Sequence, residues 1–238
     1  MAFQVFASGL SKMINRGIEI FGDSIMKGIM LDDAGRYYVA QGSAASELME
    51  EFPGMIVNRA KFGCTIGKGL VQVERFLKNA KEGSCVLLEF GGNDCDFDWN
   101  KVAASPKEEH LPNTPLPVFI ETYEKMISLI REKGIEPVIM NLPPIDAHRY
   151  LDWITRLGAD RDSIMEFLGD EQRIYRYQEL YSQTVTNLAA KMQVRCVDVR
   201  SAFLYNDNYG RLMCEDGIHP NENGQRLIKD VLMKTCTA

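Results

Sequence analysis

The chain has 238 residues, of which 45% are hydrophobic and 25% charged, enough for one well-packed domain or at most two small ones. Its 33 acidic residues outnumber 27 basic ones and give a net charge of −6. Nucleic-acid binding needs basic surface, so this balance argues against nucleic acid as a partner. No apolar run approaches the ~20 residues that a membrane span needs, and the apolar residues 2–10 lack the preceding positive charge of a secretory signal.

The cysteines and histidines argue against a disulfide framework or a metal site. Six cysteines are scattered without CxxC spacing, and none of the three histidines is followed four residues later by another. We therefore expect a reduced, cytoplasmic protein with no metal and no cofactor. The cysteines are Cys64, Cys85, Cys95, Cys196, Cys214 and Cys236.

Short apolar runs alternate with longer amphipathic ones along the whole chain. In chain order, strands are predicted at residues 17–21, 55–58, 85–90, 137–140 and 194–199. Helices are predicted at 44–52, 69–80 and 117–133, after residue 170, and at the C-terminus behind a cap at Asn221. This order implies parallel strands with helices on both faces, a three-layer α/β/α sandwich in a single domain.

Residues 145–170 do not fit the alternation, because they are too many for a simple connection. We expect a helical insertion here that forms a lid or wall beside the active site. Pro143 precedes the insertion, while His148, Tyr150 and Trp153 lie within it. These four residues are predicted to line the substrate pocket, where the aromatic rings would stack on a sugar or border an acyl slot. Packing of the insertion onto the sheet explains the same rings equally well.

A serine becomes nucleophilic only when a base takes its proton, and histidine held by a carboxylate is the usual base. Of the three histidines only His219 has a carboxylate at close, turn-compatible spacing, in Asp216-Gly217-Ile218-His219. Alone this spacing is weak evidence, since a loop that merely leads into the last helix explains both residues as well. Asp198, at the end of the last predicted strand, is a competing acid without a neighbouring histidine.

Ser24 is the candidate nucleophile because it follows the first predicted strand, in Gly22-Asp23-Ser24. In parallel sheets, active groups gather at the carboxyl ends of the strands. Taken by itself, however, a serine after a strand more often caps a helix.

An acyl-transfer enzyme also needs donors for the oxyanion that forms in its transition state. The Asn93 side chain, after the strand at 85–90, could supply one donor. The backbone N–H of Gly63, after the strand at 55–58, could supply another. Taken alone, each of these residues is more often a turn former.

Considered together, these motifs are more specific than any one of them. In chain order they are Gly-Asp-Ser at 22–24, Asn58 with Gly63, Gly-Gly-Asn-Asp at 91–94, and Asp-x-x-His-Pro at 216–220. This series resembles the SGNH/GDSL hydrolase superfamily over about residues 18–235, with Ile25 in place of the eponymous leucine.

The resemblance implies a flavodoxin-like parallel sheet of five strands and a Ser24–His219–Asp216 triad. It also implies an oxyanion hole formed by the backbone N–H groups of Ser24 and Gly63 and the side chain of Asn93. Asp23 and Asp94 would brace their turns, and Asn58 would anchor the Gly63 loop.

The spacing of residues excludes two motifs of other protein classes, the phosphate-binding loop and the serine elbow of α/β-hydrolases. Residues 63–69 have three residues between the first two glycines where a phosphate-binding loop needs four. Ser24 is followed two residues later by Met26, so the Gly-x-Ser-x-Gly elbow of α/β-hydrolases is absent.

The sequence therefore predicts a serine esterase that hydrolyses small carboxylic esters, with acetyl or short-chain acyl groups and carbohydrate as one candidate alcohol. An acyltransferase with the same triad, which would favour transfer to an added alcohol, is one alternative. A non-catalytic small-molecule binder, which would react with no serine-directed probe, is the other.

Overall fold

The computed structural model describes residues 16–156 and 158–235; residues 2–10 and Cys236, discussed above, lie outside these ranges. One sheet contains five strands, β1 (Ile18–Gly22), β4 (Ile56–Asn58), β5 (Cys85–Glu89), β6 (Glu136–Met140) and β7 (Arg195–Val197). They lie in the order β4-β1-β5-β6-β7, and every neighbouring pair is parallel. Numbered along the chain this is 2-1-3-4-5, the flavodoxin-like order, so the predicted α/β sandwich is confirmed.

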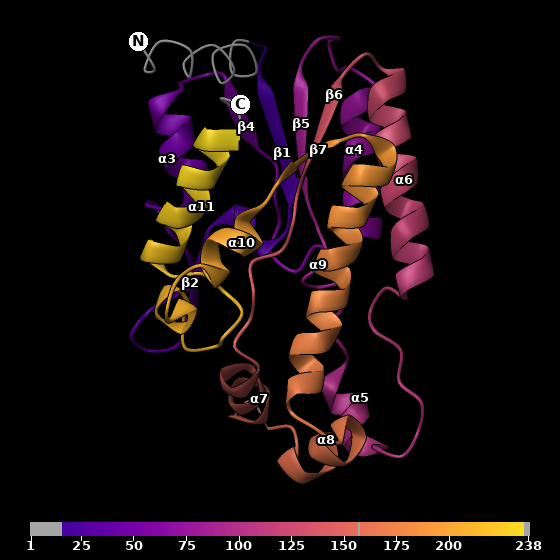
Figure 1. Cartoon of the computed structure of the whole chain (residues 1–238), viewed down its shortest axis with the longest axis vertical. Helices are drawn as coiled ribbons and strands as arrows, with labels where there is room; N and C mark the ends of the chain where they lie inside the picture. Colours follow the sequence, from indigo (N-terminus) through magenta and orange to yellow (C-terminus); the bar gives the residue numbers. More distant parts are fainter. Residues whose placement is uncertain (1–15, 157, 236–238) are drawn as a thin grey trace.

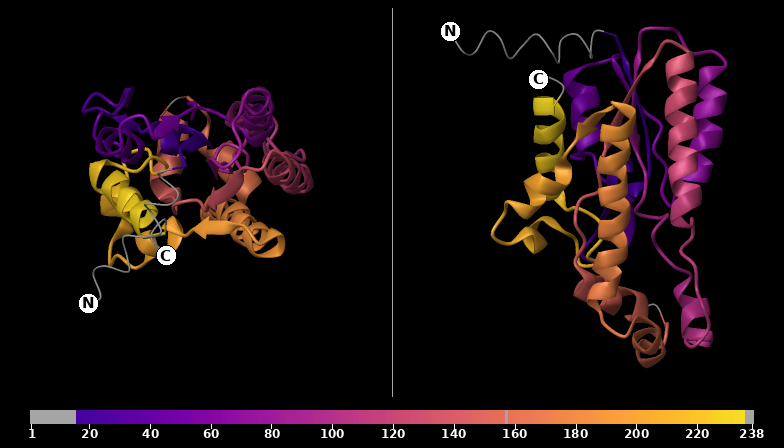
Figure 2. Two further views of the ribbon diagram at one scale, coloured as in Figure 1. Left: turned by 90° about the horizontal axis from the view of Figure 1, so that it is seen from above. Right: turned by 45° about the vertical axis from the view of Figure 1, so that its right-hand side comes forward.

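Helices cover both faces of the sheet (Figures 1 and 2). One face is covered by α3 (Ala44–Glu51), α10 (Val199–Leu204) and α11 (Glu222–Thr235). The other is covered by α4 (Ile66–Leu77), α6 (Leu116–Glu132) and α9 (Gln172–Met192).

Alternation along the strands explains why the sheet has two apolar faces. Successive side chains of a strand point to opposite sides. Ile20 and Leu87 pack in the core under α3 and α11, whereas Phe21, Val86 and Leu88 pack under α4, α6 and α9. Since both sets are buried, the strands read as continuous apolar runs.

Several short elements were not predicted from the sequence. These are α2 (Ser24–Lys27), the antiparallel pair β2 (Ile29–Leu31) and β3 (Tyr37–Val39), α5 (Trp99–Ala104) and the 3₁₀ turn η1 (Tyr209–Leu212). The last sheet strand is shorter than predicted because Asp198 accepts a hydrogen bond from the Ser201 N–H at 3.1 Å. That bond caps α10 and ends the extended chain at Val197.

Residues 145–170 contain two helices, α7 (Ala147–Arg156) and α8 (Arg161–Leu168). Both helices lie with α5 beyond the carboxyl ends of the strands, at the bottom of Figure 1, and the first part of α9 reaches down to them. These elements share a third apolar cluster. No helix within the described ranges has the length and apolar character needed to cross a membrane.

Candidate active site

Ser24 is presented by the turn that ends β1. Asp23, not Ser24, is the N-cap of α2, because its Oδ1 accepts the Ile25 N–H at 2.9 Å. Ser24 is the first residue of the helix, so its hydroxyl is not used for capping. The alternative interpretation of Ser24 as a helix cap is therefore wrong.

Ser24, His219 and Asp216 form a continuous hydrogen-bonded chain. His219 Nε2 lies 2.8 Å from Ser24 Oγ, and His219 Nδ1 lies 2.5 Å from Asp216 Oδ2. All three side chains are buried. Asp198, the competing acid, instead accepts a hydrogen bond from the Asn141 side chain at 2.7 Å.

The loop that carries Asp216 and His219 is fixed by its own backbone. Asp216 Oδ1 accepts the N–H groups of Ile218 and His219, each at 3.1 Å. Gly217 has φ +73°, and a Cβ there would lie 2.5 Å from the Asp146 carbonyl oxygen, so this turn requires glycine. Burial acts to raise the pKa of Asp216, but the hydrogen bonds and charge of His219 outweigh it and hold that pKa below its ordinary value.

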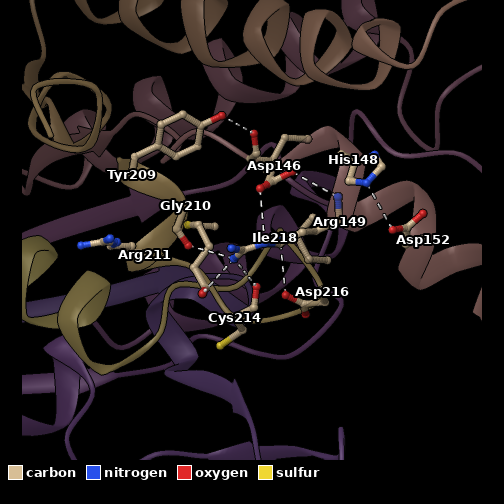
Figure 3. A network of polar contacts seen from close by, with 12 residues as sticks. Asp146, His148, Arg149, Asp152, Tyr209, Gly210, Arg211, Cys214, Asp216 and Ile218 are labelled. Carbon is tan, nitrogen blue, oxygen red and sulfur yellow. Dashed lines mark hydrogen bonds and ion pairs between the residues drawn. The ribbon is translucent and has the colours of Figure 1, made fainter. Parts of the chain in front are cut away.

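The first turn of α7 is bonded to the same loop (Figure 3). The Asp146 N–H donates to the Gly217 carbonyl at 2.8 Å. The Arg149 guanidinium donates to the carbonyls of Gly210 at 2.8 Å and Cys214 at 3.4 Å. The beginning of the insertion therefore supports the loop that carries His219. A lid movement of residues 145–170 stays a prediction.

The other motif residues lie around the same cavity as Ser24 and His219. Gly63 and Asn93 both line it, and Gly63 has φ +64°, a conformation that favours glycine. Asn93 Nδ2 donates to Asp23 Oδ2 at 2.9 Å, which orients the amide and leaves its second N–H available.

Asn58 and Asp94 brace the turns near these donors. Asn58 Nδ2 donates to the Met26 carbonyl at 2.7 Å, and its Oδ1 accepts the Ala60 N–H at 3.0 Å, joining α2 to the chain that leads to Gly63. Both carboxylate oxygens of Asp94 accept the N–H of Ile66 at the start of α4, at 3.0 and 3.1 Å.

Glu89 is a buried acid behind the site that the sequence analysis missed. Its Oε2 accepts the Asp23 N–H at 3.1 Å, while Oε1 is buried with no hydrogen-bond partner. A Cβ on Gly22 would lie 2.8 Å from Glu89 Oε2, and one on Gly92 would lie 3.2 Å from Asp23 Oδ2. Glycine at both positions thus leaves room for the two carboxyl groups. Burial first, and the Asp23 charge second, raise the pKa of Glu89 well above its ordinary value.

We expect Glu89→Gln to fold and hydrolyse esters nearly as well as the wild type, because glutamine has the same shape and is uncharged. Glu89→Ala should lower the free energy of unfolding by about 1–3 kcal/mol, since the buried Asp23 N–H loses its acceptor. Urea unfolding of both variants at pH 7 tests this. Equal destabilisation by glutamine and alanine would show that Glu89 is needed as a charged group.

The four predicted pocket residues separate into two pairs. Pro143 and Tyr150 line the cavity. Trp153 does not, because it packs edge-on against Tyr37 with ring centroids 5.9 Å apart. His148 also lies outside the cavity, on the exposed side of α7, where it pairs with Glu171 at 3.2 Å. The expectation that His148 and Trp153 face the substrate is therefore corrected.

Aromatic side chains that were not predicted complete the walls. Tyr37 and Phe62 lie against the His219 ring, with centroid separations of 5.1 and 6.2 Å. Phe97 and Trp99, from the segment after Gly-Gly-Asn-Asp, border the inner part of the cavity. The Asp-Phe-Asp-Trp sequence at 96–99, which follows this motif after Cys95, was the available signal.

Asp96 gives the fold a pH dependence. Burial outweighs the hydrogen bonds from Tyr150 and Trp99 and raises the pKa of Asp96 from an ordinary 3.8 to about 6. Between these values the folded chain keeps a proton that the unfolded chain has released. Stability from this group is therefore present at low pH and falls as pH rises from about 4 to 6.

We expect Asp96→Asn to remove this dependence. Urea unfolding at pH 4, 5, 6 and 7 should show the wild type losing stability relative to the variant as pH rises. Taking the difference between the two proteins cancels the other titrating groups. A difference that stays constant over this range would contradict the assignment.

Within residues 16–156 and 158–235, no group of three or more histidine, cysteine or acidic side chains is arranged to hold a metal ion.

Comparison with known proteins identifies the family of this chain. The model of the GDSL-like Lipase/Acylhydrolase family matches residues 20–227, which include Ser24, Gly63, Asn93, Asp216 and His219. The chain belongs to this family. As a GDSL-like lipase/acylhydrolase it is an esterase-type hydrolase.

Two relatives of this GDSL-like chain are esterases by name. An isoamyl acetate-hydrolyzing esterase of Saccharomyces cerevisiae is 23% identical over 221 residues, which are 90% of this chain and 83% of the yeast protein. GDSL esterase/lipase WDL1 of Oryza sativa subsp. japonica is 22% identical over 153 residues. That match covers 63% of this chain and about half, 52%, of the rice protein.

Solved structures share the fold of this GDSL-like chain. A lipase/acylhydrolase from Enterococcus faecalis has a TM-score of 0.62 at 20% identity, with 93% of this chain and 95% of that chain covered. An acetyl xylan esterase from Geobacillus stearothermophilus has a TM-score of 0.63 at 16% identity, with 92% and 94% covered.

Proposed function

We propose that this chain is a serine esterase that hydrolyses small carboxylic esters through an acyl-enzyme. The observation that carries the proposal is a pair of buried hydrogen bonds. His219 Nε2 lies 2.8 Å from Ser24 Oγ, and His219 Nδ1 lies 2.5 Å from Asp216 Oδ2. The first bond places a base where it can take the proton of the serine hydroxyl, and the second holds that base in a fixed orientation.

The reaction follows from the positions of these atoms. Ser24 Oγ attacks the ester carbonyl while His219 Nε2 takes its proton. Asp216 holds Nδ1 protonated and stabilises the imidazolium. His219 then donates the proton to the departing alcohol, and the acyl group remains on Ser24. A water molecule repeats the sequence and releases the acid.

The negative oxygen of each tetrahedral intermediate would be bound by the N–H groups of Ser24 and Gly63 and by the Asn93 amide. All three residues border the cavity next to the Ser24 hydroxyl. Donors that are already held in place stabilise charge without reorganising during the reaction. The bond from Asn93 to Asp23 supplies that orientation.

Asn93→Ala is expected to lower kcat by about 10²–10³ with a much smaller change in KM, because the lost bond forms mainly in the transition state. Steady-state hydrolysis of p-nitrophenyl butyrate measures both constants. Asn113→Ala serves as a control, since that amide donates to the Asn93 carbonyl from an exposed position. A kcat for Asn93→Ala within threefold of the wild type would exclude the amide as a donor.

Two experiments test the function as a whole. A fluorophosphonate probe should label Ser24 in the wild type, and mass spectrometry of peptides locates the label. Hydrolysis should also fall at acid pH, because a protonated imidazole cannot accept the serine proton. Absence of labelling, together with no loss of hydrolysis at acid pH, would contradict the proposal. A cytoplasmic location stays a prediction from the cysteine pattern.

A further inference from the structure

The cavity at Ser24 continues past the edge of the sheet into the space between α5, α7 and α9. The whole cavity, from Ser24 to the space between these helices, has a volume of about 160 Å³, and the part between the helices is called its inner end. The walls of this inner end come from the three helices and from the loops after β5 and β6, and their side chains are less than a tenth exposed. They are Phe97, Trp99, Leu142, Ile145, Tyr150 and Ile174.

The polar side chains at the inner end are already bonded to protein groups. The Asp96 carboxylate accepts the Tyr150 hydroxyl at 2.6 Å and the Trp99 indole N–H at 2.9 Å. The Gln178 amide donates to a main-chain carbonyl at 2.7 Å and accepts from Arg200 at 2.9 Å. A sugar hydroxyl placed here would lose its bonds to water and find few replacements. The inner end therefore favours an apolar group.

The position of His219 decides which half of the ester enters the inner end. If His219 protonates the departing alcohol, that alcohol lies on the histidine side of the cavity. There the neighbouring rings are Tyr37 and Phe62, which are 38% and 54% exposed. The alcohol thus lies toward solvent, and the acyl group points the other way, past Asn93.

We propose that the inner end of the cavity binds the acyl group of the substrate and accepts an apolar acyl chain of about six carbons. This inference rests on the proposed function of Ser24. An apolar cavity of roughly 150 Å³ holds a ligand the size of benzene. The whole cavity has about this volume, so it has room for a six-carbon acyl group whose carbonyl lies at Ser24 and whose chain fills the inner end. An acetyl group would leave most of the apolar wall without contact.

Esters that differ only in the acyl chain test the proposal. With p-nitrophenyl acetate, butyrate, hexanoate and decanoate, we expect kcat/KM to rise roughly fourfold per added methylene up to hexanoate, since each methylene leaves water. We expect it to fall at decanoate, whose chain exceeds the cavity. A kcat/KM that is highest for acetate would overturn the proposal.

Substitutions at Ile174 test the same space from the protein side. Ile174→Phe should lower kcat/KM for hexanoate at least tenfold relative to acetate, because the ring occupies the inner end. Ile174→Ala should move the optimum to longer chains. Leu180→Phe is the matched control, since Leu180 lies on the same helix but is 47% exposed and outside this cavity.

Acetate hydrolysis by each variant shows that it is folded and active. If the Ile174 variants keep the wild-type chain-length profile while hydrolysis still requires Ser24, the acyl site is wrong and the esterase function stands. If hydrolysis does not require Ser24, the proposed function itself fails, and the acyl site with it.

Discussion

Replacing Ser24 with alanine is expected to lower kcat for ester hydrolysis by about 10⁵–10⁶. The reason is that no covalent intermediate can form without the Ser24 oxygen. His219 and the oxyanion donors would remain in place, so weak hydrolysis by water should persist. Substrate binding should change little, because other residues form most of the cavity wall.

The measurement is single-turnover and steady-state hydrolysis of p-nitrophenyl hexanoate by matched preparations. Ser128→Ala is a suitable control, because Ser128 is exposed on α6 and bonds only to the Glu124 carbonyl. That variant should keep the wild-type rate. Equal rates for Ser24→Ala and the wild type would remove Ser24 from the reaction.

Asp216→Asn is expected to lower kcat by about 10⁴ while the fold is retained. Asparagine fills the same space, but its amide can present an N–H to His219 Nδ1. That contact favours the imidazole tautomer with its proton on Nε2, which cannot accept the proton of Ser24.

Asp198→Asn is the control for this prediction, because Asp198 was the competing candidate for the acid. It caps α10 and accepts hydrogen bonds from Asn141 and Ser201. We expect its kcat and its free energy of unfolding to stay near the wild-type values, because asparagine caps a helix about as well as aspartate. The reverse pattern, a large loss of kcat in Asp198→Asn alone, would assign the acid to Asp198.

Elements with strong local patterns could be predicted from the sequence. The strand at Cys85–Glu89 is apolar except for its last residue, and the Gly91-Gly92 pair stops it. Helix α6 carries Tyr123, Met126, Ile127 and Ile130 at helical spacing. Such patterns follow from the geometry of one element, so no distant contact is needed to recognise them.

Short elements depend on contacts made across the fold and were missed. The strand pair β2–β3 has only three residues in each strand, and the β3 residues are exposed. Its role is to place Tyr37 against His219, which no local pattern indicates. Helix α5 is likewise short and packs on α8 in the third apolar cluster.

At the active site, the sequence by itself determined which residue types stand at which strand ends. Gly-Asp-Ser and Gly-Gly-Asn-Asp follow predicted strands, and turns after parallel strands meet at one edge of the sheet. The resemblance to the SGNH/GDSL hydrolases then assigned roles to Gly63, Asn93, Asp216 and His219. Only the tertiary structure shows which groups these residues contact. Glu89 reads as a charged strand end in the sequence, and only the fold shows it buried under Asp23.

The same distinction holds for the insertion. Residues 145–170 contain aromatic side chains, but their spacing in the sequence does not show which of them face the site. On α7, Tyr150 turns inward to Asp96, whereas His148, two residues away, turns outward to Glu171. Residues two apart on a helix point in different directions, so the orientation of the whole helix on the sheet decides which of them reaches the cavity.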